Sequence, residues 1–136
     1  MQEQVLRDFF EGRCSAVELS RDLDGSLVPA SPQITKYPVV DMDSDLEVKP
    51  EYLLRVCEAV IAGAIEPWKL QAIGFCLVAS DRFHWDGDTD LGSLVAETAH
   101  DWSSPETNYP LTLENVAMFR RRLANGIQAY GSGRSA

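Results

Sequence analysis

The sequence predicts a mainly α-helical protein, a compact bundle of about five to six helices around a buried central helix at about residues 67–80. Apolar residues recur every three to four positions in most segments, the spacing that places them on one face of a helix. Residues that favour helix starts, such as Ser15, Pro50 and Thr112, stand at the beginnings of these segments. The chain has 136 residues, of which 45% are hydrophobic, so we expect one domain over residues 1–130.

The first two helices are predicted at residues 2–12 and 15–24. Apolar side chains share one face of the first, and Gly12 is a suitable stop. Ser15 and Glu18 form the Ser-x-x-Glu pattern of a capping box. The two helices are therefore expected to be joined by a tight turn.

Residues 25–49 interrupt the helical pattern, because they contain three prolines and a run of alternating aspartates. They form either short strands or a binding loop. Within residues 34–48, the segments 34–40 and 46–48 could pair as a short, irregular β-hairpin, with Pro38 restricting it to an edge.

The helix predicted at residues 50–63 begins at Pro50, which is well tolerated in a first turn, and its apolar residues follow one face. The next helix, at about residues 67–80, is apolar nearly all round. From Trp68 to Ser80, only Lys69 and Gln71 interrupt an otherwise apolar or small sequence. This pattern is typical of a helix buried at the centre of a bundle.

Three residues of the central helix carry specific expectations. Gly74 lacks a side chain and so allows close packing against a neighbouring helix. Phe75 and Leu77 are expected to be buried in the core.

Residues 82–90 are predicted to form a turn, and the next helix follows directly. After a loop at residues 103–111, Thr112 is expected to cap a last helix that ends at Gly126. Residues 131–136 are expected to be a flexible tail.

The chain is strongly acidic, with 21 acidic and 12 basic residues and a formal net charge of −9. Residues 1–48 and 81–110 each carry a net charge of −6, whereas residues 111–136 carry +3. Phosphate contacts need lysine and arginine, so the sequence disfavours nucleic acid and anionic membranes as direct ligands. A basic protein is the partner that the charge favours; the alternative is that the charge serves solubility alone.

Several features favour a cytoplasmic protein. No segment reaches the roughly 20 apolar residues that a membrane span needs, and the first residues lack the pattern of a signal peptide. Cys14, Cys57 and Cys76 fit neither a disulfide framework nor a paired zinc motif. The sequence does not indicate an oligomeric state.

An acidic run resembles a calcium-binding loop in part. Asp86, Asp88 and Asp90 occupy positions 1, 3 and 5 of an EF-hand loop, and Glu97 falls at position 12. Position 6 should be glycine for the sharp turn, but here it is Leu91. The other interpretation is an acidic helix start that interacts favourably with the helix dipole. We expect no metal site here and keep a calcium-dependent regulatory module as an alternative function.

Acidic and aromatic residues of two predicted loops are the candidates for partner binding. Exposed aromatic residues with a charged rim are typical of protein interfaces, although core packing and solvated turns would also explain them. The candidates are Asp41, Asp43, Asp45, Glu47, Trp85, Asp86, Asp88, Asp90 and Tyr109.

The sequence favours a non-enzymatic protein without a cofactor. It contains no glycine-rich phosphate loop, no GxSxG and no HExxH or CxxC motif. Cys57 and Cys76 lie on apolar helix faces, where cysteine usually acts as a small hydrophobic residue. A small enzyme with an unrecognised site stays open as a further alternative.

Residues 9–23 are similar to the opening of small helical bacterial immunity proteins of the colicin D type. Phe9, Gly12, Ser15, Ala16, Glu18 and Leu19 match that pattern of a helix, a short turn and an acidic second helix. The resemblance implies an inhibitor of a bacterial toxin, such as a basic nuclease. Residues 100–123 resemble part of a bacterial family of unassigned function.

Overall fold

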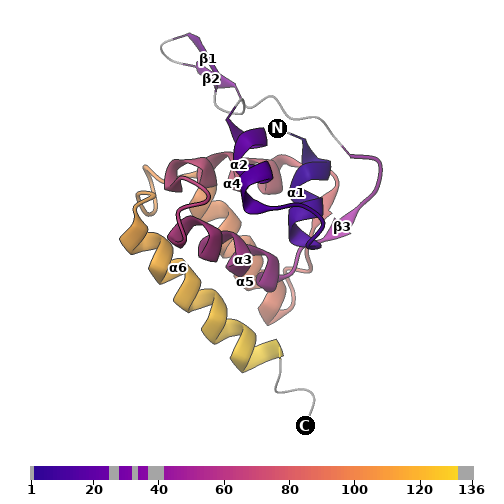
Figure 1. Cartoon of the computed structure of the whole chain (residues 1–136). Helices are drawn as coiled ribbons and strands as arrows, with labels where there is room; N and C mark the ends of the chain where they lie inside the picture. The colour runs from indigo at the N-terminus through magenta and orange to yellow at the C-terminus, as the bar shows by residue number, and fades with distance from the viewer. Residues whose placement is uncertain (1, 25–27, 32–33, 37–41, 132–136) are drawn as a thin grey trace.

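The structure is a computed structural model that describes residues 2–24, 28–31, 34–36 and 42–131. Six α-helices lie in these residues and form a mainly helical bundle, which confirms the predicted fold class (Figure 1). No described helix is both long enough and apolar enough to span a membrane. The helices are α1 (Glu3–Phe10), α2 (Ala16–Leu23), α3 (Pro50–Ile61), α4 (Leu70–Ala79), α5 (Asp90–Ser103) and α6 (Leu113–Gly126). The strands are β1 (Val28–Ser31), β2 (Ile34–Lys36), β3 (Leu46–Glu47) and β4 (Phe83–His84), and single helical turns occupy η1 (Pro67–Lys69) and η2 (Ile127–Gly131).

The tight turn between α1 and α2 has the predicted capping box. The Ser15 hydroxyl accepts the Glu18 N–H at 3.1 Å, and the Glu18 carboxylate accepts the Ser15 N–H at 3.1 Å. Gly12 has a φ of +81°, a conformation that favours glycine. The Arg55 guanidinium of α3 donates to the Phe10 carbonyl at 2.6 Å, which fixes the end of α1 on the bundle.

Among the described helices, α4 packs closely against α5, and α3 packs against α6. A Cβ atom on Gly74 would lie 2.6 Å from the Ser103 nitrogen and 2.8 Å from the Ala99 carbonyl oxygen. Only glycine therefore permits this approach of the two helix backbones, as the sequence predicts.

One expectation about the central helix is wrong. Leu77 is buried, with 1% of its surface exposed, but Phe75 is 38% exposed and Val78 is exposed as well. Phe75 and Val78 are three residues apart and share a face of α4 that the bundle leaves at the surface. An apolar run gives no rotation of the helix about its axis, so the sequence could not show which side meets solvent.

Burial and side-chain size predict opposite orders of stability loss for alanine substitutions at these two positions. Size alone would make Phe75→Ala the costlier change, whereas burial makes Leu77→Ala the costlier one. Leu77→Ala should lower the free energy of unfolding by about 2–5 kcal/mol, because it opens a cavity in the core. Phe75→Ala should cost less, about 1–2 kcal/mol, since its ring already contacts solvent. Urea unfolding followed by circular dichroism measures both. A larger loss for Phe75→Ala than for Leu77→Ala would contradict this orientation of α4.

Lys69 interrupts the apolar run in the sequence, yet it is 1% exposed. Its ammonium lies 2.6 Å from an Asp24 carboxylate oxygen and 3.3 Å from one of Glu66. It also donates to the Ser20 hydroxyl at 2.8 Å and the Ser20 carbonyl at 3.1 Å. These partners satisfy the buried charge and tie the end of α2 to the start of α4.

The predicted pairing of residues 34–40 with 46–48 is wrong. β2 pairs antiparallel with β1, and β3 pairs in parallel with β4, with Leu46 opposite Phe83. The part of the predicted hairpin at residues 37–41 lies outside the described residues. The β3–β4 pair packs against the core. Phe83 of β4 is buried, and so is Val48, which directly follows β3.

The last helix, α6, ends at Gly126 as predicted, and the π-helical turn η2 follows it directly. Gly126 is buried, and a Cβ atom there would collide with the Leu94 side chain of α5. Gly126 therefore permits close packing of α6 against α5, and it does not adopt the left-handed conformation of a C-cap glycine. Beyond Gly131, the expected flexible tail lies outside the described residues.

Candidate binding site

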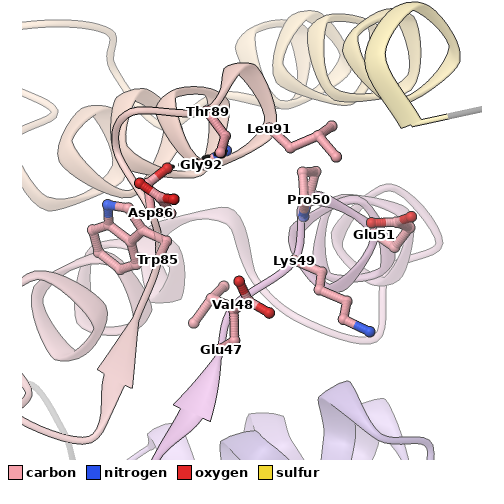
Figure 2. Close-up of a pocket in the computed structure, with 10 residues that line it drawn as sticks. All are labelled: Glu47, Val48, Lys49, Pro50, Glu51, Trp85, Asp86, Thr89, Leu91 and Gly92. Carbon is pink, nitrogen blue, oxygen red and sulfur yellow. Dashed lines mark hydrogen bonds between the residues drawn. The ribbon is translucent and has the colours of Figure 1, made fainter. Parts of the chain in front are cut away.

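A pocket of about 310 Å³ lies where β3 and β4 end and where α3 and α5 begin (Figure 2). Trp85 stands on one side of the pocket, and Pro50 and Leu91 stand on the other (Figure 2). The lining residues are Glu47, Val48, Lys49, Pro50, Glu51, Trp85, Asp86, Thr89, Leu91 and Gly92.

The parallel pairing of β3 and β4 creates this pocket. Two parallel strands leave a sheet at the same end, so the segments that follow them emerge side by side. The Val48 N–H still donates to the His84 carbonyl at 2.8 Å, which extends the pairing up to the pocket. From there one segment enters α3 at Pro50 and the other turns through Trp85 towards α5.

The wall formed by residues 86–92 is held by local hydrogen bonds. The Asp86 carboxylate accepts the Asp88 N–H at 3.0 Å. The Thr89 hydroxyl donates to the Asp86 carbonyl at 2.8 Å and accepts the Gly92 N–H at 2.9 Å, which caps α5. A Cβ atom on Gly92 would lie 2.5 Å from the Asp86 carbonyl carbon and closer still to its oxygen. The turn therefore packs directly on the backbone of the first helical turn.

The pocket has an excess of negative charge. Its lining contains the carboxylates of Glu47, Glu51 and Asp86 and the single ammonium of Lys49. No basic side chain in the described part of the chain forms an ion pair with any of these three carboxylates. In Figure 2 the side chains of Lys49 and Glu51 extend away from Trp85. A hollow with an excess of one sign of charge concentrates the electrostatic potential and attracts the opposite charge.

Three of the predicted partner-binding residues line this pocket together: Glu47, Trp85 and Asp86. Trp85 is half-buried and packs on the core with part of its ring. Asp88 and Asp90 are exposed in the adjoining turn and at the start of α5.

Asp43 and Asp45 do not line the pocket. Both residues precede β3, whereas the pocket lies where this two-residue strand ends. Asp45 is paired with Arg82 at 3.2 Å, so part of its charge is already neutralised. Asp41 lies outside the described residues.

Tyr109 does not belong to the pocket. It follows the C-terminal end of α5, whereas the pocket lies at the N-terminal end, about 20 Å away along a helix of 14 residues. Its ring packs edge-on against Phe119 at 5.8 Å. It covers the core at the other end of the bundle.

The four residues of the calcium-like pattern are not arranged as one loop. Asp90 is the first residue of α5, and Glu97 lies two turns further along, about 10 Å along the axis. Glu97 is paired with Arg122 at 3.0 Å. Among the described residues, no group of three or more histidine, cysteine, aspartate or glutamate side chains could hold a metal ion.

Burial suppresses thiol reactivity at two of the cysteines. Burial raises the pKa of Cys57 to about 12. It also raises the pKa of Cys14, with the charges of nearby acidic residues adding to the effect. Both thiols therefore stay protonated near neutral pH and are weak nucleophiles.

Sequence reasoning missed the apolar half of the pocket. Val48 and Pro50 fit the pattern of a strand and a helix start, and Leu91 fits an apolar helix stripe. These apolar residues line one pocket because the parallel pair of β3 and β4 brings together segments almost 40 positions apart in the chain. No local sequence signal indicates such a pair.

Comparison with known proteins gives no identification: no family model, no curated protein and no solved structure matches the chain.

Proposed function

We propose that the protein is a non-enzymatic binding module for a basic protein. The observation that supports this function is the pocket beside β3 and β4, which combines apolar walls with carboxylates that lack basic partners among the described residues. Protein interfaces concentrate binding energy where an anchor side chain enters such a pocket inside a polar rim. Trp85 supplies the aromatic wall, and Glu47 and Asp86 supply the charge.

The acidic surface would also accelerate association. The chain carries a net charge of −9, and Asp86, Asp88 and Asp90 are exposed around the pocket. Opposite charges on two proteins can raise association rates to about 10⁸–10⁹ M⁻¹s⁻¹ at low salt. The pocket would then determine how the encountering partner is held.

A finer form of the proposal is an immunity-type inhibitor of a nuclease-like toxin in a bacterial cytoplasm. Its support is the resemblance of residues 9–23 and the acidic charge, since a nuclease cleft is basic and an acidic protein can occupy it. Co-expression with a toxin encoded beside this gene is the test. Survival of the cells would support the inhibitor role, whereas unchanged killing would contradict it.

Neutralising the acidic residues beside the pocket is expected to slow association. The triple variant Asp86→Asn, Asp88→Asn, Asp90→Asn should reduce the association rate at low salt by about tenfold, because it removes steering charge. At about 0.1 M salt the Debye length is about 10 Å, so the effect should shrink. Stopped-flow kinetics at two salt concentrations, with the partner isolated from the native host, measure both rates.

The double variant Asp43→Asn, Asp45→Asn is the control, because these residues do not line the pocket and Asp45 is already paired with Arg82. It should change the association rate less than the triple variant does. Thermal melting should show little loss of stability in either, since exposed charges contribute about 1 kcal/mol or less. Unchanged low-salt association in both variants would mean that the charge serves solubility, and the proposed function would fail.

A further inference from the structure

We propose that the pocket binds one arginine side chain of the partner, inserted between Trp85 and Pro50. This inference rests on the proposed function, because it names the group that the same site would recognise.

The size of the pocket fits a single long side chain. Ligand pockets for small molecules range from about 300 to 1,000 Å³, and this one, at about 310 Å³, lies at the lower limit. One extended side chain fits within it while the partner backbone stays outside.

The walls suit the two parts of an arginine side chain. Val48, Pro50 and Leu91 offer apolar contact to the methylene groups, which long basic side chains bury readily. The Trp85 ring offers a flat face on which a guanidinium can stack. Trp85 precedes the hydrogen-bonded turn at residues 86–89 and Leu91 follows it in the first turn of α5, so the fold holds the spacing between the two walls.

The charges favour a cation that can bond to two carboxylates. Glu47 and Asp86 belong to different segments and both line the pocket. The planar guanidinium presents five donors and can bond to both, whereas the lysine ammonium is a compact and strongly hydrated point charge.

An anion is the ligand that two helix starts would otherwise favour. Here Pro50 has no N–H to donate, and the Gly92 N–H already donates to the Thr89 hydroxyl at 2.9 Å. With Glu47 and Asp86 at the edge, a negative ligand would meet repulsion.

Nuclear magnetic resonance with three small probes tests the proposal. ¹⁵N-labelled protein is titrated with Nα-acetyl-arginine amide, its neutral citrulline analogue and Nα-acetyl-lysine amide at constant ionic strength. We expect saturable shifts of the Trp85 indole N–H and the Leu91 and Gly92 amides with the arginine probe. Citrulline should bind at least about tenfold more weakly, and lysine should fall between them. Equal binding of citrulline, or shifts confined to other residues, would overturn the proposal.

Two double variants locate the charge that matters. Glu47→Gln with Asp86→Asn should weaken the arginine probe by at least about tenfold, while the amide oxygen of Asn can still accept the Asp88 N–H. Asp43→Asn with Asp45→Asn, which also removes two charges, should change binding by less than about twofold. Equal losses in the two variants would overturn the pocket assignment. Melting temperatures check that both fold.

Failure of this inference can be told apart from failure of the proposed function. If a basic partner associates in a charge-dependent way but arginine and citrulline bind alike, the arginine assignment is wrong and the binding function stands. If the arginine probe binds as expected but the acidic variants leave partner association unchanged, the proposed function is wrong and the cation site stands.

Discussion

Trp102→Ala is expected to lower the free energy of unfolding by about 3–5 kcal/mol, among the largest effects of any single substitution in this chain. Trp102 is completely buried on α5 and meets the Phe119 ring of α6 edge-on at 6.3 Å. Its Cβ atom also lies against Gly74 of α4. The substitution would leave a cavity where three helices meet. Urea unfolding, with circular dichroism as the signal, measures the loss.

Trp68→Ala is the matched control, because this tryptophan is 43% exposed and its indole N–H bonds to the exposed Glu66. It should cost less than half as much as Trp102→Ala. Equal losses in the two variants would contradict the position of α5 in the core.

Gly92→Ala is expected to destabilise the protein and to distort the pocket. The added Cβ atom would collide with the Asp86 carbonyl group, which is backbone and cannot rotate away. The turn before α5 must therefore move, at a cost of about 1–3 kcal/mol or more. Because Trp85 and Asp86 move with that turn, binding of the arginine probe should weaken by about tenfold or more. Thermal melting and the titration described above measure the two effects.

Gly87→Ala in the same turn is the control, since a Cβ atom there would meet no atom within 4 Å. It should leave the melting temperature and the probe affinity nearly unchanged. If Gly92→Ala is as harmless as Gly87→Ala, the close contact between the turn and α5 is not present in solution.

Local patterns predict the helices of this fold well, because a helix is made of contacts between residues three and four positions apart. The predicted caps at Ser15 and Thr112 both form, each accepting a backbone N–H at 3.1 Å. Pro50 begins α3 as expected. The close approach at Gly74 also follows from the sequence, since only glycine permits it.

The remaining features depend on contacts that the local sequence does not encode. β3 and β4 are distant in the chain and pair in parallel, so no turn signal connects them. The exposure of Phe75 depends on how α4 is rotated in the bundle, and the role of Gly126 depends on the nearby Leu94.

The sequence predicted only part of the candidate site, because the rest depends on contacts between distant segments. Acidity and an aromatic residue are visible in the sequence and identified Glu47, Trp85 and Asp86. Asp43 and Asp45 do not line the pocket, and Tyr109 follows the far end of α5. The acidic and aromatic candidates look alike in the sequence, and only the folded structure shows which of them line the pocket.

Site-specific photocrosslinking in the native host tests most directly whether a basic partner docks at the pocket. Lys49→p-benzoylphenylalanine places the crosslinker at the pocket without removing a carboxylate, and Val17 and Leu113 are exposed positions on α2 and α6 for comparison. We expect position 49 to capture a basic protein through a peptide that contains arginine, and the combined change Glu47→Gln, Asp86→Asn to abolish the product. Capture of the partner from position 17 or 113, with none from position 49, would contradict docking at the pocket.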